Sequence, residues 1–197
     1  GRHALMSERD NDDDGIVNIL DPYPEGCPSG HYATDGTCEL TEPGYYTNDL
    51  PPYEQFPCQP GTYQPSYGQL DCIDASPGHY VVDAASASQT PCGVGSYQPD
   101  SGESSCIQSE PGNYVSDEGS IRQNQCSSGT YQPSSGATDC LDASPGYYVT
   151  GFGSEEQTPC AAGTYQILPG ATSCFQAGPG FHVPSELSLI HISEPTR

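Results

Sequence analysis

The sequence predicts a small disulfide-rich fold, mostly irregular with short β-hairpins, in which about five 34-residue units form an elongated tandem-repeat rod without a large core. Three observations lead to this prediction: a motif that recurs at fixed spacing, ten regularly placed cysteines, and an abundance of glycine and proline. Self-similarity at a fixed period is typical of repeat architectures, in which each unit mainly contacts its neighbours.

The repeat is clearest in the cysteines and glycines. Units that begin Cys-x-x-Gly start at Cys58, Cys92, Cys126 and Cys160, which gives the period of 34 residues. A glycine recurs at half that spacing, and all but the last of this series has a tyrosine two residues later. The glycines are Gly61, Gly78, Gly95, Gly112, Gly129, Gly146, Gly163 and Gly180. Each unit therefore contains two similar halves.

Composition limits what the chain can bury. With 23 Gly, 20 Pro, no Trp and only 33% hydrophobic residues in 197, a large aliphatic core is not available. Small units of this kind need covalent or metal staples, and an even number of regularly spaced cysteines indicates disulfides formed in an oxidising compartment. We therefore expect an extracellular protein, secreted or at the cell surface. The sequence has no apolar run of about 18 residues, so we expect no membrane insertion within this segment.

The net charge is strongly negative. Four Lys and Arg stand against 26 Asp and Glu, which gives a formal net charge of -22. Nucleic acids and anionic membranes are excluded as partners, because binding their phosphates requires the opposite sign. Cation binding fits this charge. A solvated acidic surface is the simpler interpretation of most of these carboxylates.

The chain opens with two short segments. Residues 1–9 carry no interpretable pattern, and because the first residue is not Met we expect a fragment whose export signal lies upstream. Residues 10–24 are acidic, with oxygen-bearing side chains at positions 1, 3, 5, 9 and 12 of a loop whose position 6 is Gly15. This order suits Ca²⁺, with a backbone carbonyl at position 7. The predicted ligands are Asp10, Asp12, Asp14, Ile16 (through its carbonyl), Asn18 and Asp21; the alternative is an acidic linker.

This acidic stretch resembles a thrombospondin type 3 calcium repeat. That family consists of Asp-x-Asp-x-Asp-Gly loops that often precede adhesive or stalk modules. The stretch departs from an EF-hand because Asp21 stands where Glu is usual, and because Pro22 and Pro24 exclude a helix immediately after the loop.

Five units follow, at residues 27–57, 58–91, 92–125, 126–159 and 160–186; the first is three residues shorter between its cysteines, and the last is truncated. Pro-Gly dipeptides predict turns, and the tyrosine segments after them predict short strands. Gly and Pro inside every copy exclude the paired helices that also use this period. We interpret the recurring tyrosine as the aromatic that covers each disulfide; the alternative is a ligand-binding row of tyrosines.

Two disulfide schemes respect the spacing. In the first, each unit closes on itself; in the second, bonds such as Cys38–Cys58 or Cys72–Cys92 join consecutive units and leave Cys27 and Cys174 unpaired. An unpaired thiol in an oxidising compartment is reactive, so the first scheme is preferred. It comprises Cys27–Cys38, Cys58–Cys72, Cys92–Cys106, Cys126–Cys140 and Cys160–Cys174. Zinc is disfavoured because no Cys-x-x-Cys pair occurs.

The motif Cys-x-x-Gly-Thr-Tyr-Gln-x-x-x-Gly-x-x-x-Cys, as in Cys126 to Cys140, resembles the ephrin-receptor-like cysteine-rich repeat. That family is built of extracellular, disulfide-laddered units found in receptor ectodomains and in large surface proteins of microbes, and the resemblance covers residues 27 to about 183. The family commonly has two further cysteines in each unit. Here these places hold Ala75 and Gln89, and their equivalents Ser109 and Gln123, Ala143 and Gln157. Their joint absence supports pairing within units and leaves open how rigid each second half is.

Residues 187–197 break the repeat, since Glu194 stands where the period requires a cysteine. The string resembles an in-frame translation of a transposase sequencing adapter. We therefore expect it to be an artefact of a truncated read, with an environmental (metagenomic) library as the source of the fragment.

The function expected from these features is non-catalytic. An extracellular cysteine-rich segment with Ca²⁺ at its first loop would act as a spacer or adhesive part of a larger surface or secreted protein, with proteins or glycans at the cell surface as its partners. The alternatives are the ligand-recognition ectodomain of a receptor and an accessory region of a secreted enzyme. Common catalytic motifs are absent from the sequence, and the carboxylate pairs Asp71/Asp74 and Asp139/Asp142 flank a cysteine as solvated turn residues.

Overall fold

The structure is a computed structural model in which residues 26–35 and 37–179 are described. The predicted calcium loop and residues 180–197 lie outside this part. By their contacts the residues group into two bodies. The N-terminal body comprises Gly1–Pro91 and Asp100–Ser105, and the C-terminal body comprises Cys92–Pro99 and Cys106–Arg197.

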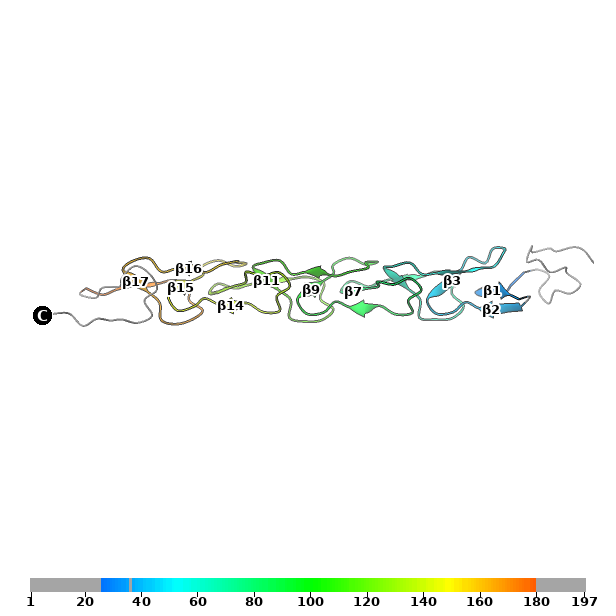
Figure 1. Cartoon of the computed structure of the whole chain (residues 1–197), viewed down its shortest axis with the longest axis horizontal. Coiled ribbons are helices and arrows are strands. Elements are labelled where there is room, and N and C mark those ends of the chain that lie inside the picture. Colours follow the sequence, from blue (N-terminus) through cyan, green and yellow to red (C-terminus); the bar gives the residue numbers. More distant parts are fainter. Residues whose placement is uncertain (1–25, 36, 180–197) are drawn as a thin grey trace, which may run out of the picture. The chain divides into compact units, whose positions relative to one another are not determined.

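The described residues form β-hairpins and no helix, as Figure 1 shows. Each sheet has two antiparallel strands that follow one another in sequence, so each is a hairpin. We number the hairpins 1 to 9 in chain order. Their strands are β1 (His31–Thr34) with β2 (Thr37–Leu40), β3 (Tyr45–Thr47) with β4 (Gln55–Pro57), β5 (Thr62–Tyr63) with β6 (Ile73–Asp74), β7 (His79–Tyr80) with β8 (Thr90–Pro91), β9 (Ser96–Tyr97) with β10 (Ile107–Gln108), β11 (Asn113–Tyr114) with β12 (Asn124–Gln125), β13 (Thr130–Tyr131) with β14 (Leu141–Asp142), β15 (Tyr147–Tyr148) with β16 (Thr158–Pro159), and β17 (Thr164–Tyr165) with β18 (Phe175–Gln176).

One hairpin corresponds to one half of a 34-residue unit. In hairpin 5, Tyr97 is paired with Ile107, and in hairpin 6, Tyr114 is paired with Asn124, at places 17 residues apart. The predicted disulfide-rich fold of short β-hairpins, without a large core, is confirmed for the described residues.

A four-residue turn starts each hairpin. In hairpin 6 it runs from Glu110 to Asn113, whose amide donates to the Glu110 carbonyl at 3.0 Å. Pro111 occupies the second place, where a fixed negative φ is required, and Gly112 occupies the third with a φ of 77°. Proline followed by a left-handed residue is the signature of a type II turn. The Pro-Gly dipeptides therefore act as predicted.

Backbone hydrogen bonds join neighbouring hairpins within each body. In the C-terminal body, Gly112 N–H donates to the carbonyl of Gln132 at 2.7 Å, and Val115 N–H donates to that of Ala137 at 2.9 Å. The N-terminal body repeats this geometry, since Gly44 N–H donates to the carbonyl of Gln64 at 2.7 Å. Because these bonds use only main-chain groups, they place few demands on the side chains that face solvent.

The same glycines are required by close packing. A Cβ added to Gly112 would overlap the carbonyl oxygen of Gly153, and one added to Gly61 would overlap that of Gly102. Main chain thus contacts main chain between one hairpin and the second hairpin after it. At Gly61, Gly95, Gly112 and Gly129, glycine is therefore required by this contact as well as by the turn.

The buried residues are small and form repeated positions instead of one core. The apolar ones are cysteine, alanine and valine, together with Tyr53: Tyr53, Cys58, Ala75, Val81, Cys92, Val115, Cys126, Ala143 and Val149. Most of the larger aliphatic side chains among the described residues are exposed instead. Hydrophobic burial is therefore modest, as expected for a chain with so few large apolar residues.

The first hairpin shows the effect of its shorter loop. Strands β1 and β2 have four residues each, where hairpins 3 to 9 have two per strand. The two cysteines Cys27 and Cys38 are 11 positions apart, against 14 in the other disulfides. Removing three residues from the loop brings the strands together over a longer ladder.

Candidate functional site

The feature that repeats through the described residues is the closure of each hairpin, in one of two alternating ways. Hairpins 1, 3, 5, 7 and 9 are closed by a disulfide, and we call them disulfide hairpins. Hairpins 2, 4, 6 and 8 are closed by a glutamine side chain, and we call them glutamine hairpins. The two kinds alternate along the chain.

Each disulfide lies within one hairpin. The pairs are Cys27–Cys38, Cys58–Cys72, Cys92–Cys106, Cys126–Cys140 and Cys160–Cys174, and no cysteine in the described residues is free. Their Cα atoms are 5.5 to 5.8 Å apart, in the ordinary range for a disulfide. This pairing matches the first of the two schemes considered from the spacing.

The glutamine hairpins use the places where the second cysteine would stand. Gln123 Oε1 accepts a hydrogen bond from the Glu110 amide at 2.7 Å, and Gln123 Nε2 donates to the Glu110 carboxylate at 3.0 Å. Equivalent bonds from a main-chain amide reach Gln55 at 3.3 Å, Gln89 at 2.7 Å and Gln157 at 2.6 Å. A side-chain bond therefore ties the two ends of these hairpins together, where the disulfide hairpins have a covalent bond.

The first cysteine position is equally informative. In glutamine hairpins it holds Thr41, Ala75, Ser109 or Ala143, and each of these is fully buried, as are Cys58, Cys92 and Cys126. Only small side chains fit there, because the main chain of neighbouring hairpins packs against this position. Ala75, for example, donates its amide to Gly61 and accepts from Gly102, both at 2.8 Å.

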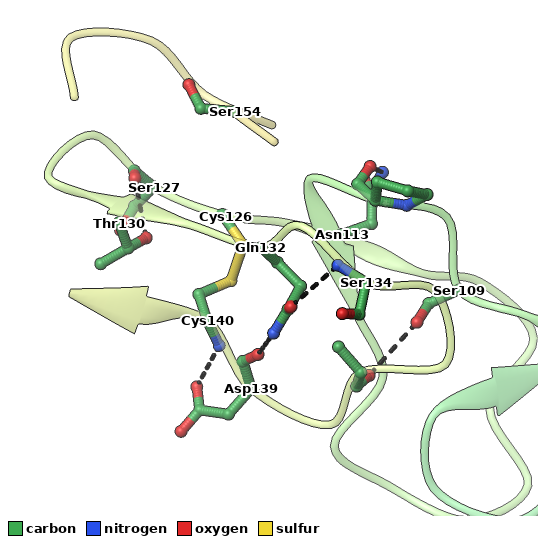
Figure 2. The surroundings of a disulfide bond; sticks show 12 residues. Ser109, Asn113, Cys126, Ser127, Thr130, Gln132, Ser134, Asp139, Cys140 and Ser154 are labelled. Atoms are coloured by element: carbon green, nitrogen blue, oxygen red, sulfur yellow. Dashed lines mark hydrogen bonds between the residues drawn. A yellow bond between two sulfur atoms is a disulfide. The ribbon is translucent and has the colours of Figure 1, made fainter. Parts of the chain in front are cut away.

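A second glutamine braces the loop of the disulfide hairpins from inside. Gln132 Nε2 donates to the Asp139 carbonyl at 2.8 Å, and its Oε1 accepts from the Ser134 amide at 3.1 Å; Figure 2 shows this side chain spanning the loop beside the Cys126–Cys140 bond. Gln132 is only 8% exposed, so both of its polar atoms need partners. Gln64 and Gln166 make the same pair of bonds in their own loops.

Valine or threonine replaces the bracing glutamine in the glutamine hairpins. Thr47, Val81, Val115 and Val149 are buried at that place. From hairpin 2 onward the two types therefore differ at coupled positions: a disulfide occurs with a buried glutamine, and a glutamine closure occurs with a small β-branched residue. Hairpin 1 is the exception, because Ala33 stands at the place of the bracing glutamine.

The tyrosines lie in the first strand of each hairpin and are mostly half-buried. In hairpins 3, 5, 7 and 9 they pair across the ladder with an apolar residue; in hairpin 7, for example, Tyr131 is opposite Leu141. In hairpin 1 the partner of Tyr32 is Glu39. In hairpin 9, the rings of Tyr165 and Phe175 have centroids 6.0 Å apart. These apolar partners are Ile73, Ile107, Leu141 and Phe175, and they are 44 to 56% exposed.

Charged groups are almost all acidic, and most are solvated. Among the tyrosines, Tyr32 lies beside carboxylates, and its hydroxyl donates to Glu39 at 3.4 Å. Burial, and then the carboxylates of Glu39 and Glu42, raise the pKa of this phenol above its ordinary value, because each disfavours the phenolate. An open hollow in the C-terminal body also presents two carboxylates; its lining is Pro133, Ser154, Glu155, Glu156 and Thr158.

The predicted calcium ligands, Asp10 to Asp21, lie outside the described residues. Within residues 26–35 and 37–179, no group of three or more His, Cys, Asp and Glu side chains is arranged to hold a metal. The same residues contain no helix long and apolar enough to cross a membrane.

Sequence reasoning missed both roles of glutamine. It treated Gln89, Gln123 and Gln157 only as places where a cysteine is absent, although glutamine recurs there in each of the first four units. That recurrence was the available signal, because a residue that merely fills a vacant place would vary. The bracing glutamine was likewise part of the recognised motif without an assigned function.

Comparisons with known proteins give no further guide to the family. No family model matches the chain, and no curated protein is significantly similar to it.

Proposed function

We propose that this chain is a non-catalytic, extracellular cysteine-rich segment that serves as a spacer or adhesive part of a larger surface or secreted protein. The observation that carries the proposal is that successive hairpins within each body are joined by the same main-chain bonds. A joint made of main-chain bonds, with glycine and small residues at fixed places, can be repeated many times, which suits an element whose length is its function.

The disulfides support the proposed location. All ten cysteines are paired in disulfides, whereas the reducing systems of the cytosol would keep their thiols reduced. Each closed loop of this size stabilises its hairpin by about 3 kcal/mol in the chain-entropy model. This contribution offsets the small hydrophobic burial.

A length series tests the spacer function. Residues 58–91 and residues 92–125 are each one whole unit, and deleting either joins one unit boundary to the next. We expect both deletions to shorten the maximum dimension measured by small-angle X-ray scattering by equal amounts, and duplication of a unit to lengthen it by the same amount. The proposal would be contradicted if the two deletions changed the maximum dimension unequally, or if the maximum dimension did not change with the number of units.

We further propose that Ca²⁺ binds at Asp10, Asp12, Asp14, Asn18 and Asp21, with the Ile16 carbonyl as a further ligand. The support is the alternation of oxygen side chains around Gly15. Titration calorimetry of the intact chain at millimolar Ca²⁺ tests this, with Asp12→Asn/Asp14→Asn as the matched variant. The proposal expects heat from the intact chain and loss of most of it in the variant. No heat from the intact chain would end the assignment.

One observation favours ligand recognition as a second candidate. Exposed apolar residues recur on the disulfide hairpins of the C-terminal body, at Ile107, Leu141 and Phe175, each opposite a tyrosine. A receptor ectodomain would use such pairs as contacts. The variant Ile107→Ser/Leu141→Ser separates the two functions, because it should abolish binding by a receptor segment and leave the dimension of a spacer unchanged.

A further inference from the structure

Basic residues are rare in this chain and unevenly placed. It contains no lysine and four arginines, Arg2, Arg9, Arg122 and Arg197. Arg122 is thus the sole Lys or Arg among the described residues. It follows Ile121 in the loop of hairpin 6, a glutamine hairpin. Endopeptidases of the trypsin class require a cationic side chain on the amino side of the bond they cut, so the described residues offer them one site.

The main chain at this site is open. Ile121 is 54% exposed and Arg122 is also exposed. Neither residue belongs to a strand, and no main-chain hydrogen bond outside the strands of the described residues uses the amide or carbonyl of either. The two preceding residues, in contrast, are fixed by main-chain hydrogen bonds. The Ser120 carbonyl accepts from the Gln98 amide at 3.0 Å, and the Gly119 amide donates to the Cys92 carbonyl at 2.8 Å. A protease that binds its substrate as an extended strand therefore meets free main-chain groups at Arg122 and Ile121.

The position of Arg122 relative to the disulfides gives a cut there a specific consequence. The residue lies between Cys106, which is bonded to Cys92, and Cys126, which is bonded to Cys140. No disulfide spans it. A cut inside a disulfide loop, as between Cys58 and Cys72, would leave both pieces covalently joined. A cut at Arg122 divides the chain into two pieces that each keep complete disulfide hairpins.

We propose that Arg122 is a processing site at which an arginine-specific, trypsin-class endopeptidase divides this cysteine-rich segment. In the reaction, water adds across the peptide bond between Arg122 and Gln123. Arg122 gains a carboxylate and Gln123 gains a free amine, and no disulfide is exchanged. Gln123 lies on the carboxyl side of the cut, and the hydrogen bonds of its side chain to Glu110 fix the start of the second piece.

Limited digestion of the native, oxidised chain with trypsin tests the proposal. The expected result is cleavage after Arg122, at a rate within about tenfold of that of the reduced and unfolded chain, because the site requires no global unfolding. Mass spectrometry should identify pieces that end at Arg122 and begin at Gln123, and they should migrate separately on a denaturing gel without reductant. The proposal is overturned if Arg122 stays uncut over a time in which the unfolded chain is fully cut.

Two variants serve as controls. Arg122→Gln should remove the cleavage while leaving the thermal midpoint within a degree or two, since the side chain makes no hydrogen bond to any described residue. Asp71→Arg in the Arg122→Gln background places the arginine three half-units earlier, inside the Cys58–Cys72 loop. Its pieces should separate only after reduction. Separation without reductant in this second variant, or its absence after cleavage at Arg122, would contradict the disulfide argument.

Discussion

At the scale of the residue, the repeated glycines are constrained by both their backbone conformation and their close packing. Gly112 has a φ of 77° and faces the carbonyl of Gly153, so any Cβ there meets both backbone strain and an overlap. We expect Gly112→Ala to lower the free energy of unfolding by about 2 to 4 kcal/mol, because a left-handed non-glycine residue alone costs about 1 to 3 kcal/mol. Denaturant unfolding of the oxidised chain measures this.

Gly93 provides the matched control for that substitution. It has no neighbour within 4 Å of an added Cβ, and its φ is not in the left-handed region. Gly93→Ala should therefore leave stability unchanged or raise it by up to about 1 kcal/mol. Equal effects of the two substitutions would contradict the close main-chain packing described above.

The closing glutamine is the other residue with a defined role. Gln123→Ala removes two hydrogen bonds to Glu110, and we expect a loss of about 1 kcal/mol, because the freed Glu110 amide is exposed and regains water. Thermal unfolding compared with Gln125→Ala measures the difference, since the exposed Gln125 side chain makes no hydrogen bond within the described part of the chain. A Gln123 effect no larger than that of Gln125 would show that this closure contributes nothing.

At the scale of the element, the two kinds of hairpin share one backbone plan, so one should be convertible into the other. Ser109 and Gln123 occupy the places that Cys92 and Cys106 occupy one half-unit earlier. We expect Ser109→Cys/Gln123→Cys to form a sixth disulfide, closing a loop worth about 3 kcal/mol in the chain-entropy model. A thiol assay should find no free cysteine in the oxidised variant, while each single variant should show one. Two free thiols in the double variant would refute the equivalence.

The same comparison shows what the sequence could and could not predict. Local rules predict the turns, the strands near the tyrosines and the small buried residues. Pro-Gly favours a type II turn, and a disulfide requires the Cα atoms of its two cysteines to lie close together. The bond between Gln123 and Glu110 depends instead on which main-chain amide comes within reach after the hairpin closes. Likewise, the contact between Gly112 and Gly153 joins residues 41 positions apart, and no local rule predicts it.

At the scale of the whole molecule, the dominant property is charge. A formal net charge of -22 makes the folded chain repel itself, and few basic residues are available to compensate. We expect the thermal midpoint to rise by several degrees when the ionic strength is raised from about 0.01 M to about 0.5 M, because screening then acts over distances of a few Å. Scanning calorimetry measures it. A midpoint that falls with added NaCl would indicate that attractive ion pairs outweigh the repulsion.

Every disulfide closes its own hairpin, and glutamine closes the alternate ones. Peptide mapping under non-reducing conditions tests it most directly, using a protease that cuts at Asp and Glu, because trypsin has so few sites. Cleavage at Asp74 and Asp83 separates Cys72 from Cys92 unless a disulfide joins them. We expect peptides in which Cys92 is linked to Cys106 and Cys58 to Cys72. Recovery of Cys72 linked to Cys92 would contradict this pairing.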